Sequence, residues 1–264
     1  MPKARRFFIE GAPGSGKTTL AETLSGRGYI WVFDFGFTDS FSDRATVKTF
    51  YDEERNLSEA NAPPTSYNDF IRDLRSSYQD GALASADWWM LDSFSGLDRA
   101  SMLRHLWTEE KKGLIPEIVD YRPASEQTAQ CISELSAKAI KLNKTLLVPC
   151  HVENKEYNIA ADRPQPFMQV KGAIPMSGPV EGRYVPLVFG RLREYVAGFF
   201  TDCYYAKAGR DNQGKPEWIL QLRTDRRHPG LKCASRTAPP ELVWTIKDWS
   251  KATKRGLGEI LSLT

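Results

Sequence analysis

The feature that most constrains this chain is a glycine-rich segment near its N-terminus, which reads GAPGSGKT over residues 11–18. It fits the pattern G-x-x-x-x-G-K-[ST] at every position. It also follows an apolar run at residues 6–10, predicted as a strand, and precedes a helix predicted over residues 18–26. Glycines let backbone N–H groups curl around phosphate oxygens, and the helix N-terminus adds a positive end. The chain is therefore expected to fold as an α/β P-loop protein that binds a nucleotide.

Two side chains of this motif are expected to act on the phosphates. Lys17 can reach the β- and γ-phosphates, and the Thr18 hydroxyl can ligate Mg²⁺. The predicted cofactors are therefore ATP and Mg²⁺. The residues predicted to bind them are Gly11, Ala12, Pro13, Gly14, Ser15, Gly16, Lys17, Thr18 and Thr19.

A second magnesium ligand is expected at the end of a buried strand, and Asp92 fits this position. An apolar run at residues 88–91 leads directly into it, and Ser93 follows. Asp92 is predicted to hold Mg²⁺ together with Thr18. The alternative is that Asp92 only caps the helix that comes next.

Hydrolysis also needs a group that orients or deprotonates water. Asp34 closes the second predicted strand and is the first candidate, with Glu10 and Asp39 as the others. The alternative is that all three are loop carboxylates or caps. His151 ends the fifth predicted strand, where a polar side chain would face the γ-phosphate across the carboxyl ends of a parallel sheet. The alternative is that His151 is an ordinary hydrogen-bonded surface histidine.

Short apolar runs alternate with helical stretches along the chain, which favours α/β with a mainly parallel sheet. Residues 152–184 are rich in Pro, Gly and charge, and are predicted as a long loop containing a hairpin. The further predicted strands are residues 29–35, 46–51, 87–91, 145–150, 203–208 and 218–224. The further predicted helices are residues 67–79, 125–142 with Ser125 as N-cap, 190–200, and a helical tail over 238–264 after Pro239 and Pro240.

Composition excludes several classes of protein. Four cysteines lie far apart without a CxxC pair, so a zinc site or a disulfide framework is not expected. No apolar run approaches the ~18 residues of a membrane span, and the N-terminus turns polar too early for a signal peptide. A cytoplasmic location is expected. The net charge of +3 is too small to indicate a nucleic-acid binder by itself.

The layout as a whole resembles the RecA-like ATPases of bacteriophages, a group of phage nucleotide-binding proteins that includes single-strand annealing recombinases. The matching pieces are FIEGAPGSGKTTL at residues 8–20, WVFDFG at 31–36, MLDSF at 90–94, VPCHVE at 148–153, PLVFGRL at 186–192 and FTD at 200–202. The P-loop is highly specific, whereas the other pieces are persuasive through their order and spacing. The resemblance covers roughly residues 5–236.

The resemblance implies a P-loop NTPase with a RecA-like core, a mainly parallel central sheet flanked by helices, and late antiparallel strands. It implies that another strand separates the P-loop strand from the Asp92 strand, and that His151 is the polar sensor at the head of a DNA-facing loop, residues 152–184. Cations and aromatic rings in a loop suit single-stranded DNA. The expected DNA-binding residues are Lys155, Arg163, Lys171 and Arg183. The net charge of this loop is nearly zero, so the alternative is a surface loop that does not contact DNA.

Two further points concern catalysis. RecA-like enzymes usually have a glutamate two residues after the aspartate that corresponds to Asp34, whereas this chain has Gly36. The identity of the catalytic carboxylate and the speed of turnover are therefore open. RecA-like proteins also complete the site with basic residues of a neighbouring subunit, and Arg223 and Arg226 are the candidates for such fingers. The alternative is that these arginines belong to a basic turn on the surface or to a patch that contacts DNA.

The predicted organisation is a RecA-like ATPase core over residues 1–237 followed by the tail at 238–264. The predicted function is an ATPase that acts on single-stranded DNA in phage recombination, annealing or replication, as a homo-oligomer with nucleotide at its subunit interfaces. If the chain is phage-encoded, the host cytoplasm is its expected location. The alternatives are a nucleotide or small-molecule kinase, because many of these enzymes open with a similar P-loop, or a nucleotide-dependent assembly module without fast turnover.

Overall fold

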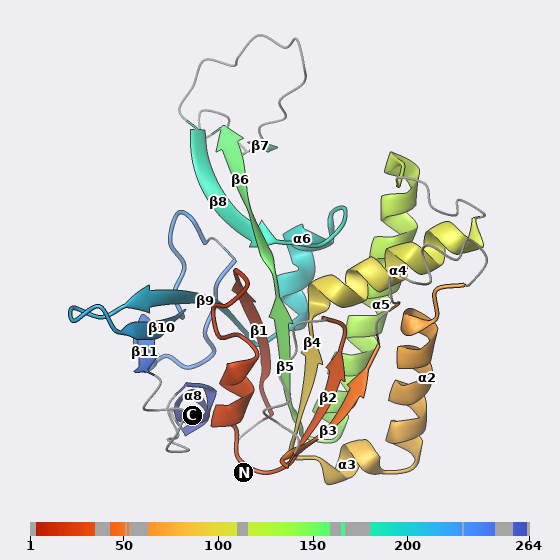
Figure 1. Ribbon diagram of the computed structural model, residues 1–264, viewed down its shortest axis with the longest axis horizontal. Coiled ribbons are helices and arrows are strands. Elements are labelled where there is room, and N and C mark those ends of the chain that lie inside the picture. The colour runs from red at the N-terminus through yellow and green to blue at the C-terminus, as the bar shows by residue number, and fades with distance from the viewer. Residues whose placement is uncertain are drawn as a thin grey trace.

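The central feature of the computed structural model is one eight-stranded β-sheet with helices on both faces (Figure 1). The structure describes residues 4–34, 43–50, 52, 63–109, 116–158, 165–166, 180–228, 230–245 and 256–262. The helices and strands in chain order are β1 (Arg6–Gly11), η1 (Thr19–Thr23), β2 (Gly28–Val32), β3 (Ala45–Thr49), α2 (Ser66–Gln79), α3 (Ala82–Ser85), β4 (Trp88–Asp92), α4 (Phe94–Thr108), α5 (Ile118–Lys141), β5 (Thr145–Cys150), β6 (Val152–Asn158), β7 (Gln165–Pro166), β8 (Val180–Pro186), α6 (Leu192–Tyr195), η2 (Val196–Phe199), β9 (Asp202–Arg210), β10 (Pro216–Gln221), β11 (Glu241–Thr245) and α8 (Leu257–Ser262).

The strand order of the large sheet is β11-β10-β9-β1-β5-β4-β2-β3. All neighbours from β9 to β3 are parallel, and β10 and β11 are added antiparallel at one side. The predicted fold class is therefore confirmed: α/β, a mainly parallel sheet flanked by helices, and late antiparallel strands. Strand β5 separates the P-loop strand β1 from the Asp92 strand β4, as the resemblance implied.

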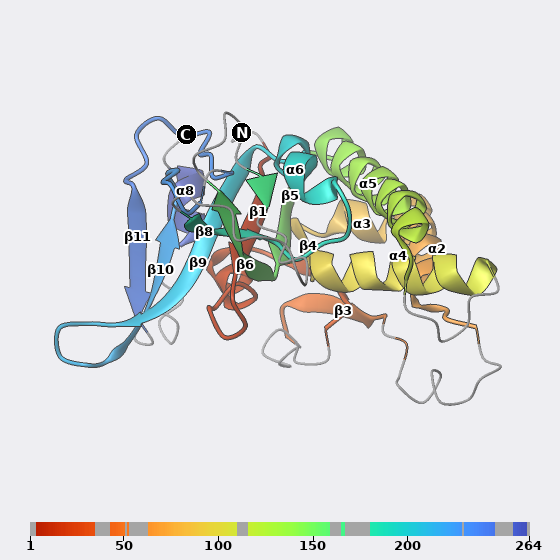
Figure 2. The ribbon, with the colours of Figure 1, turned by 90° about the horizontal axis from the view of Figure 1, so that it is seen from above.

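Two hydrophobic cores cover the two faces of the sheet. Helices α2, α4 and α5 pack on one face around large side chains that include Phe8, Trp31, Trp89 and Phe94. The short helices η1 and α8 cover the other face around Ile9 and its neighbours. Figure 2 shows these layers from above, with α4 and α5 on one side and α8 on the other. None of the helices in the described part of the chain is long and apolar enough to cross a membrane.

A second, three-stranded sheet with the order β7-β6-β8 projects from the carboxyl end of β5. Its main element is an antiparallel hairpin in which β6 pairs with β8 from Val152 opposite Pro186 to Asn158 opposite Val180. The region predicted as a long loop with a hairpin is thus a hairpin at its root. Because β6 starts two residues after β5 ends, the hairpin is a direct continuation of a central strand of the large sheet.

Seven predicted strands are confirmed to within a few residues, but several predicted helices need correction. The helix expected over residues 18–26 is only the short 3-10 helix η1, which ends at Thr23 because the backbone is extended at Leu24. The helix expected to start at Ser125 begins at Ile118 and is capped by Glu117 and Asp120. Helix α4 was not predicted, because Asp98, Ser101 and His105 share its buried face and interrupt the apolar stripe.

The C-terminal part also differs from expectation. The segment predicted as a helix over residues 190–200 is a single turn of α6 followed by the 3-10 helix η2. The prediction of a helix directly after Pro239 and Pro240 is wrong, because β11 forms there and pairs with β10. Within the predicted helical tail, the described helix is α8 alone. The division of the chain at residue 237 stays a prediction.

Candidate active site at the carboxyl ends of the parallel strands

The P-loop connects β1 to η1 and has the backbone conformation that its glycines permit. Gly14 and Gly16 have φ values of +75° and +80°, which disfavour any residue with a side chain. A Cβ at Gly11 would lie 2.4 Å from the carbonyl oxygen of Ala206, so the close approach of β1 to β9 also requires glycine. Ala12, Pro13 and Gly14 are exposed at the tip of the loop. The loop therefore has an accessible backbone where phosphate is expected.

Lys17 is buried inside this loop and is held by the loop itself. Its Nζ donates to the carbonyl oxygens of Gly11 at 2.8 Å and Ala12 at 2.7 Å, and it also contacts Ser15 Oγ at 3.4 Å. Burial lowers the pKa of the ammonium, and the nearby Asp92 and Asp34 partly offset this effect. A cation held by carbonyl oxygens in this way is ready to exchange them for phosphate oxygens, which are the stronger partners.

Thr18 and Asp92 meet as predicted for a shared magnesium site. Thr18 Oγ1 donates a hydrogen bond of 2.7 Å to Asp92 Oδ2. Burial raises the pKa of Asp92 to about 6, although the hydrogen bond from Thr18 acts in the opposite direction. A hydroxyl and a buried carboxylate are the hard oxygen ligands that Mg²⁺ takes in nucleotide sites. These residues fit the ion, with Thr18 and Asp92 as the groups that would hold it.

Asp34 and His151 also come together. Asp34 follows β2 and His151 follows β5, and His151 Nε2 hydrogen-bonds Asp34 Oδ2 at 2.8 Å. Burial alone would raise the pKa of Asp34, but hydrogen bonds from His151 and Ser93 outweigh it and hold the pKa below its usual value. Asp34 is thus an ionised carboxylate at the same end of the sheet as Lys17 and Asp92.

The backbone of His151 is fixed from two directions. Its N–H donates to Ser95 Oγ at 3.1 Å, and its carbonyl oxygen accepts from the N–H of Leu187 at 2.7 Å. Glu153 follows on β6, and its carboxylate forms an ion pair of 2.7 Å with Arg193 on α6. Arg193 also donates to the carbonyl oxygens of Val188 and Gly190. The histidine is therefore connected to the root of the hairpin and to the segment before α6.

The other two candidate carboxylates have different outcomes. Glu10 is buried at the end of β1, and burial raises its pKa to about 8. A neutral carboxyl group would be a poor substitute for Asp34 as the group that accepts a hydrogen bond or a proton from water. Asp39, like Gly36, lies outside the described residues.

The candidate finger residues lie after β10 and contact their own chain. Arg223 donates to the carbonyl oxygens of Ser235, Arg236 and Ala238 at 3.3–3.4 Å. Arg226 is exposed. Among the described residues, no hydrogen bond or ion pair joins either arginine to the P-loop or to Asp92. Their role toward a neighbouring subunit stays a prediction.

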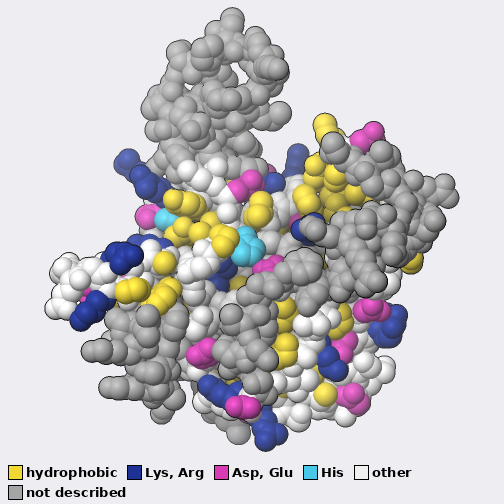
Figure 3. Space-filling view, viewed as in Figure 1, with side chains coloured by type: hydrophobic (Ala, Val, Ile, Leu, Met, Phe, Trp, Pro, Cys, Tyr) yellow, Lys and Arg dark blue, Asp and Glu magenta, His cyan; other side chains and the backbone are white. Residues whose placement is uncertain are grey.

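The segment that carries Arg226 lies against the root of the hairpin. The N–H of Tyr184 on β8 donates to the carbonyl oxygen of Arg227 at 3.0 Å, and the Tyr184 ring stacks on His228 with centroids 5.1 Å apart. Figure 3 shows Lys and Arg side chains beside this root, next to apolar side chains. Of the predicted DNA-binding residues, Arg183 lies on β8 here and Lys155 belongs to β6, whereas Arg163 and Lys171 lie outside the described residues.

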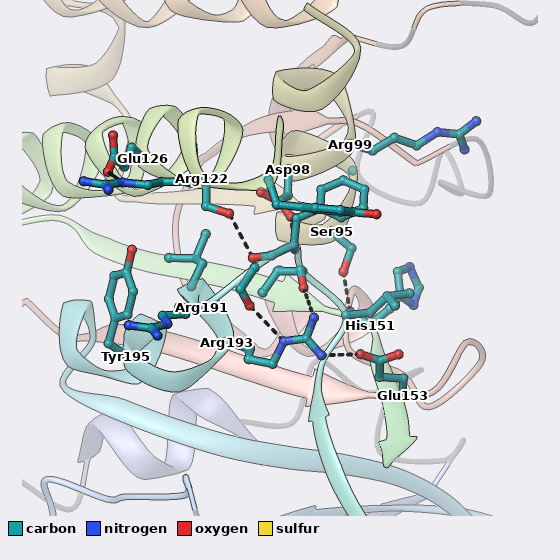
Figure 4. A pocket seen from close by; sticks show the side chains of 18 of the residues that line it. Ser95, Asp98, Arg99, Arg122, Glu126, His151, Glu153, Arg191, Arg193 and Tyr195 are labelled. Carbon is teal, nitrogen blue, oxygen red and sulfur yellow. Dashed lines mark hydrogen bonds and ion pairs between the residues drawn. The ribbon is translucent and has the colours of Figure 1, made fainter. Parts of the chain in front are cut away.

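A cavity of about 1300 Å³ opens beside the Asp34–His151 pair (Figure 4). Its walls come from the start of α4, the first half of α5 and residues 187–195. Apolar and aromatic side chains such as Tyr121 and Phe189 line it, while the Glu153–Arg193 pair lies at one side. The cavity is far larger than one water molecule needs, so an organic group can reach the Asp34 carboxylate.

Several residues of this site were not predicted from the sequence. Ser95 and Gly96 belong to the first turn of α4, and Ser93 caps this helix by accepting from the N–H of Gly96. A serine directly after a buried strand and before an apolar residue is a capping signal that was available in the sequence. Trp218 of β10 packs on Gly16 of the P-loop, where an added Cβ would lie 2.8 Å from the indole. No local pattern could have shown that contact.

No family model matches the chain, and no curated protein matches it. Among solved structures, it is similar to the flagellar accessory protein FlaH from Methanocaldococcus jannaschii, with a TM-score of 0.40 and 11% sequence identity. That match covers 93% of this chain and 87% of the other.

Proposed function

We propose that this chain is a RecA-like ATPase that binds ATP with Mg²⁺ and acts on single-stranded DNA in recombination, annealing or replication. The observation that carries the proposal is the meeting of two residue pairs beside the P-loop. Thr18 hydrogen-bonds Asp92, and Asp34 hydrogen-bonds His151, all at the carboxyl end of one parallel sheet. Open α/β sheets bind their ligands at this end. The proposed setting is the cytoplasm, which is the host cytoplasm if the chain is phage-encoded.

In this proposal each residue has one task. The P-loop N–H groups and Lys17 bind the β- and γ-phosphates, which places positive charge where negative charge develops. Thr18 and Asp92 hold Mg²⁺, which when bound neutralises phosphate charge. The Asp34 carboxylate accepts a hydrogen bond from the attacking water and orients it toward the γ-phosphorus. His151 keeps this carboxylate in place and links it to the hairpin.

The DNA part of the proposal is supported by the hairpin and its surroundings. The β6–β8 hairpin extends from the strand that ends at His151, so a ligand on the hairpin can influence the Asp34–His151 pair through the backbone. Arg183 on β8 and the neighbouring Arg226 and Arg227 supply cations at its root. Phosphates meet such charges, and exposed bases stack on aromatic rings.

Oligomerisation belongs to the same proposal. An exposed Arg226 near the hairpin root is available to a second copy of the chain, where it would neutralise charge on the transferring phosphoryl group. Arg223 is less available, since its guanidinium already binds three carbonyl oxygens of its own chain.

A second candidate function is phosphoryl transfer to a small acceptor. The cavity favours it, because Asp34 and His151 line one end and the space exceeds what hydrolysis requires. An acceptor hydroxyl in this cavity would attack the γ-phosphorus while Asp34 takes its proton, and ADP would leave.

The deciding experiment measures ATP hydrolysis with and without single-stranded DNA, with Lys17→Ala as control. DNA-stimulated release of inorganic phosphate supports the first function. Phosphate transferred to ribonucleoside, deoxyribonucleoside or sugar probes, with little free phosphate, supports the second. Nucleotide-dependent oligomers without turnover of either kind would indicate an assembly module instead.

A further inference from the structure

The first turn of helix α4 lies directly against the end of strand β2. Strand β4 ends at Asp92, Ser93 caps α4, and Gly96 lies one turn into the helix. Because β2 is the neighbour of β4 in the sheet, Phe33 and Asp34 pass beside this turn. Figure 4 shows the start of α4 from the cavity side, where Ser95 reaches the backbone of His151.

Gly96 has no space for a side chain at this contact. A Cβ there would lie 2.5 Å from Phe33 Cβ, 3.0 Å from Asp34 Oδ1 and 3.2 Å from the carbonyl oxygen of Phe33. Phe33 cannot give way easily, since its ring packs against Phe50 and Phe70 in the core. Close packing transmits such a clash to its neighbours rather than absorbing it. A side chain at residue 96 would therefore displace the Asp34 carboxylate.

The same carboxylate is held on another side by a hydrogen bond with His151. His151 Nε2 lies 2.8 Å from Asp34 Oδ2, and Ser93 Oγ accepts from the N–H of Gly96 at 3.2 Å, which fixes the turn beside this carboxylate. Ser93 also helps to hold the pKa of Asp34 below its usual value. Ser93 is fully buried and follows Asp92 directly. The start of α4 thus connects the predicted magnesium ligand with the predicted water-orienting carboxylate.

We infer that Gly96 and Ser93 are positioning residues that set the Asp34 carboxylate beside His151 for attack on the γ-phosphate. This inference rests on the proposed function, in which Asp34 orients the nucleophile. A shift of about 1 Å at such a group can cost about 100-fold in rate while ATP binding is preserved.

The test begins with Gly96→Ala. Its kcat for ATP hydrolysis is expected to fall by about tenfold or more, while KM for ATP changes by less than about twofold, since the P-loop is untouched. Combined with Asp34→Ala, the substitution should cause no further loss, because its effect acts through that carboxylate. The matched control is Gly198→Ala, because a Cβ at Gly198 meets nothing within 4 Å. Thermal unfolding of each variant establishes that it is folded.

Ser93 provides an independent test should Gly96→Ala fail to fold. Ser93→Ala is expected to lower kcat with little change in KM, and Ser93→Thr, which keeps the hydroxyl, is expected to restore most of the rate. A Ser93→Thr variant as slow as Ser93→Ala would contradict the inference. So would a folded Gly96→Ala with parental kcat, or losses that multiply with those of Asp34→Ala.

Different results would contradict the proposed function and the positioning role. A parent chain that hydrolyses no ATP and phosphorylates no acceptor would overturn the proposed function and this inference with it. Full turnover in Asp34→Ala would remove Asp34 from catalysis. By contrast, a slow Asp34→Ala together with a fully active Gly96→Ala would overturn the positioning role alone.

Discussion

His151 Nε2 lies 2.8 Å from Asp34 Oδ2, although 117 residues separate the two in the chain. Asp34 follows β2 and His151 follows β5, and β4 with its terminal Asp92 lies between these strands. The pair therefore spans the strand that carries the predicted magnesium ligand. Nδ1 of the same imidazole is buried and has no hydrogen-bond partner among the described residues. The only hydrogen bond of the ring that the structure describes is thus the one with the carboxylate.

Lys17→Ala is expected to abolish ATP turnover while the chain stays folded. The ammonium is buried against carbonyl oxygens, and burial lowers its pKa, so its charge contributes little to the stability of the ligand-free protein. Its loss should reduce kcat by about 100-fold or more, because the cation no longer meets phosphate charge. Release of inorganic phosphate and thermal unfolding would check both parts. Unchanged turnover in the folded variant would refute the P-loop assignment.

Asp92→Asn is expected to weaken magnesium-dependent hydrolysis more than nucleotide binding. The amide oxygen can still accept the hydrogen bond from Thr18, but the charge that attracts the metal ion is removed. A magnesium titration of kcat should show a higher half-maximal concentration in the variant, whereas the affinity for ATP measured separately should change little. Superimposable titrations for variant and parent would count against a magnesium site at Asp92.

Glu10→Gln is expected to change the pH dependence of stability. Burial raises the pKa of Glu10 from 4.5 to about 8, so the folded state binds a proton that the unfolded state releases. The parent chain should lose about 1.4 kcal/mol of unfolding free energy per pH unit from this group between pH ~5 and ~8. The contribution is fully present below the unfolded pKa and disappears above the folded one.

Urea unfolding at pH 5.5 and 7.5 compares the two chains. The unfolding free energy of Glu10→Gln minus that of the parent should be about 2–3 kcal/mol larger at pH 7.5 than at pH 5.5. The raised pKa values of Asp92 and Asp98, both about 6, affect parent and variant alike and cancel in this difference. Equal pH slopes in the two chains would indicate that Glu10 is ionised in the folded state.

How far the sequence predicted this molecule depends on the range of the interactions involved. The strands were predictable because apolar runs such as residues 6–10 and 88–91 are local signals. The Thr18–Asp92 contact followed from strand ends that meet at one edge of a parallel sheet. Helix α4 escaped prediction because polar side chains share its buried face, and η1 is short because the backbone becomes extended at Leu24.

Other parts depend on contacts that no local pattern contains. The requirement for glycine at residue 96 arises from Phe33 and Asp34 on another strand, and Trp218 reaches Gly16 from across the sheet. Strand β11 forms because β10 offers it an edge, although two prolines before it suggested the start of a helix. Such tertiary contacts outweigh local propensity wherever a segment completes a sheet.

Arg193→Ala is expected to separate DNA stimulation from basal ATP hydrolysis. Arg193 pairs with Glu153 at 2.7 Å, and this glutamate lies two residues beyond His151 on β6. The guanidinium also binds the carbonyl oxygens of Val188 and Gly190, so one side chain joins the hairpin root to the segment before α6.

Without Arg193, a hairpin that binds single-stranded DNA should transmit less of that binding to His151. The stimulation of kcat by DNA should fall by about half or more, and basal kcat should stay within about twofold, because the Asp34–His151 hydrogen bond does not involve Arg193. The partly exposed pair should cost only about 1 kcal/mol of stability. Lys207→Ala is the matched control, since it removes a partly exposed ion pair, with Glu241, that does not involve the hairpin. If a folded Arg193→Ala retains full DNA stimulation, the signal from the hairpin does not pass through this ion pair.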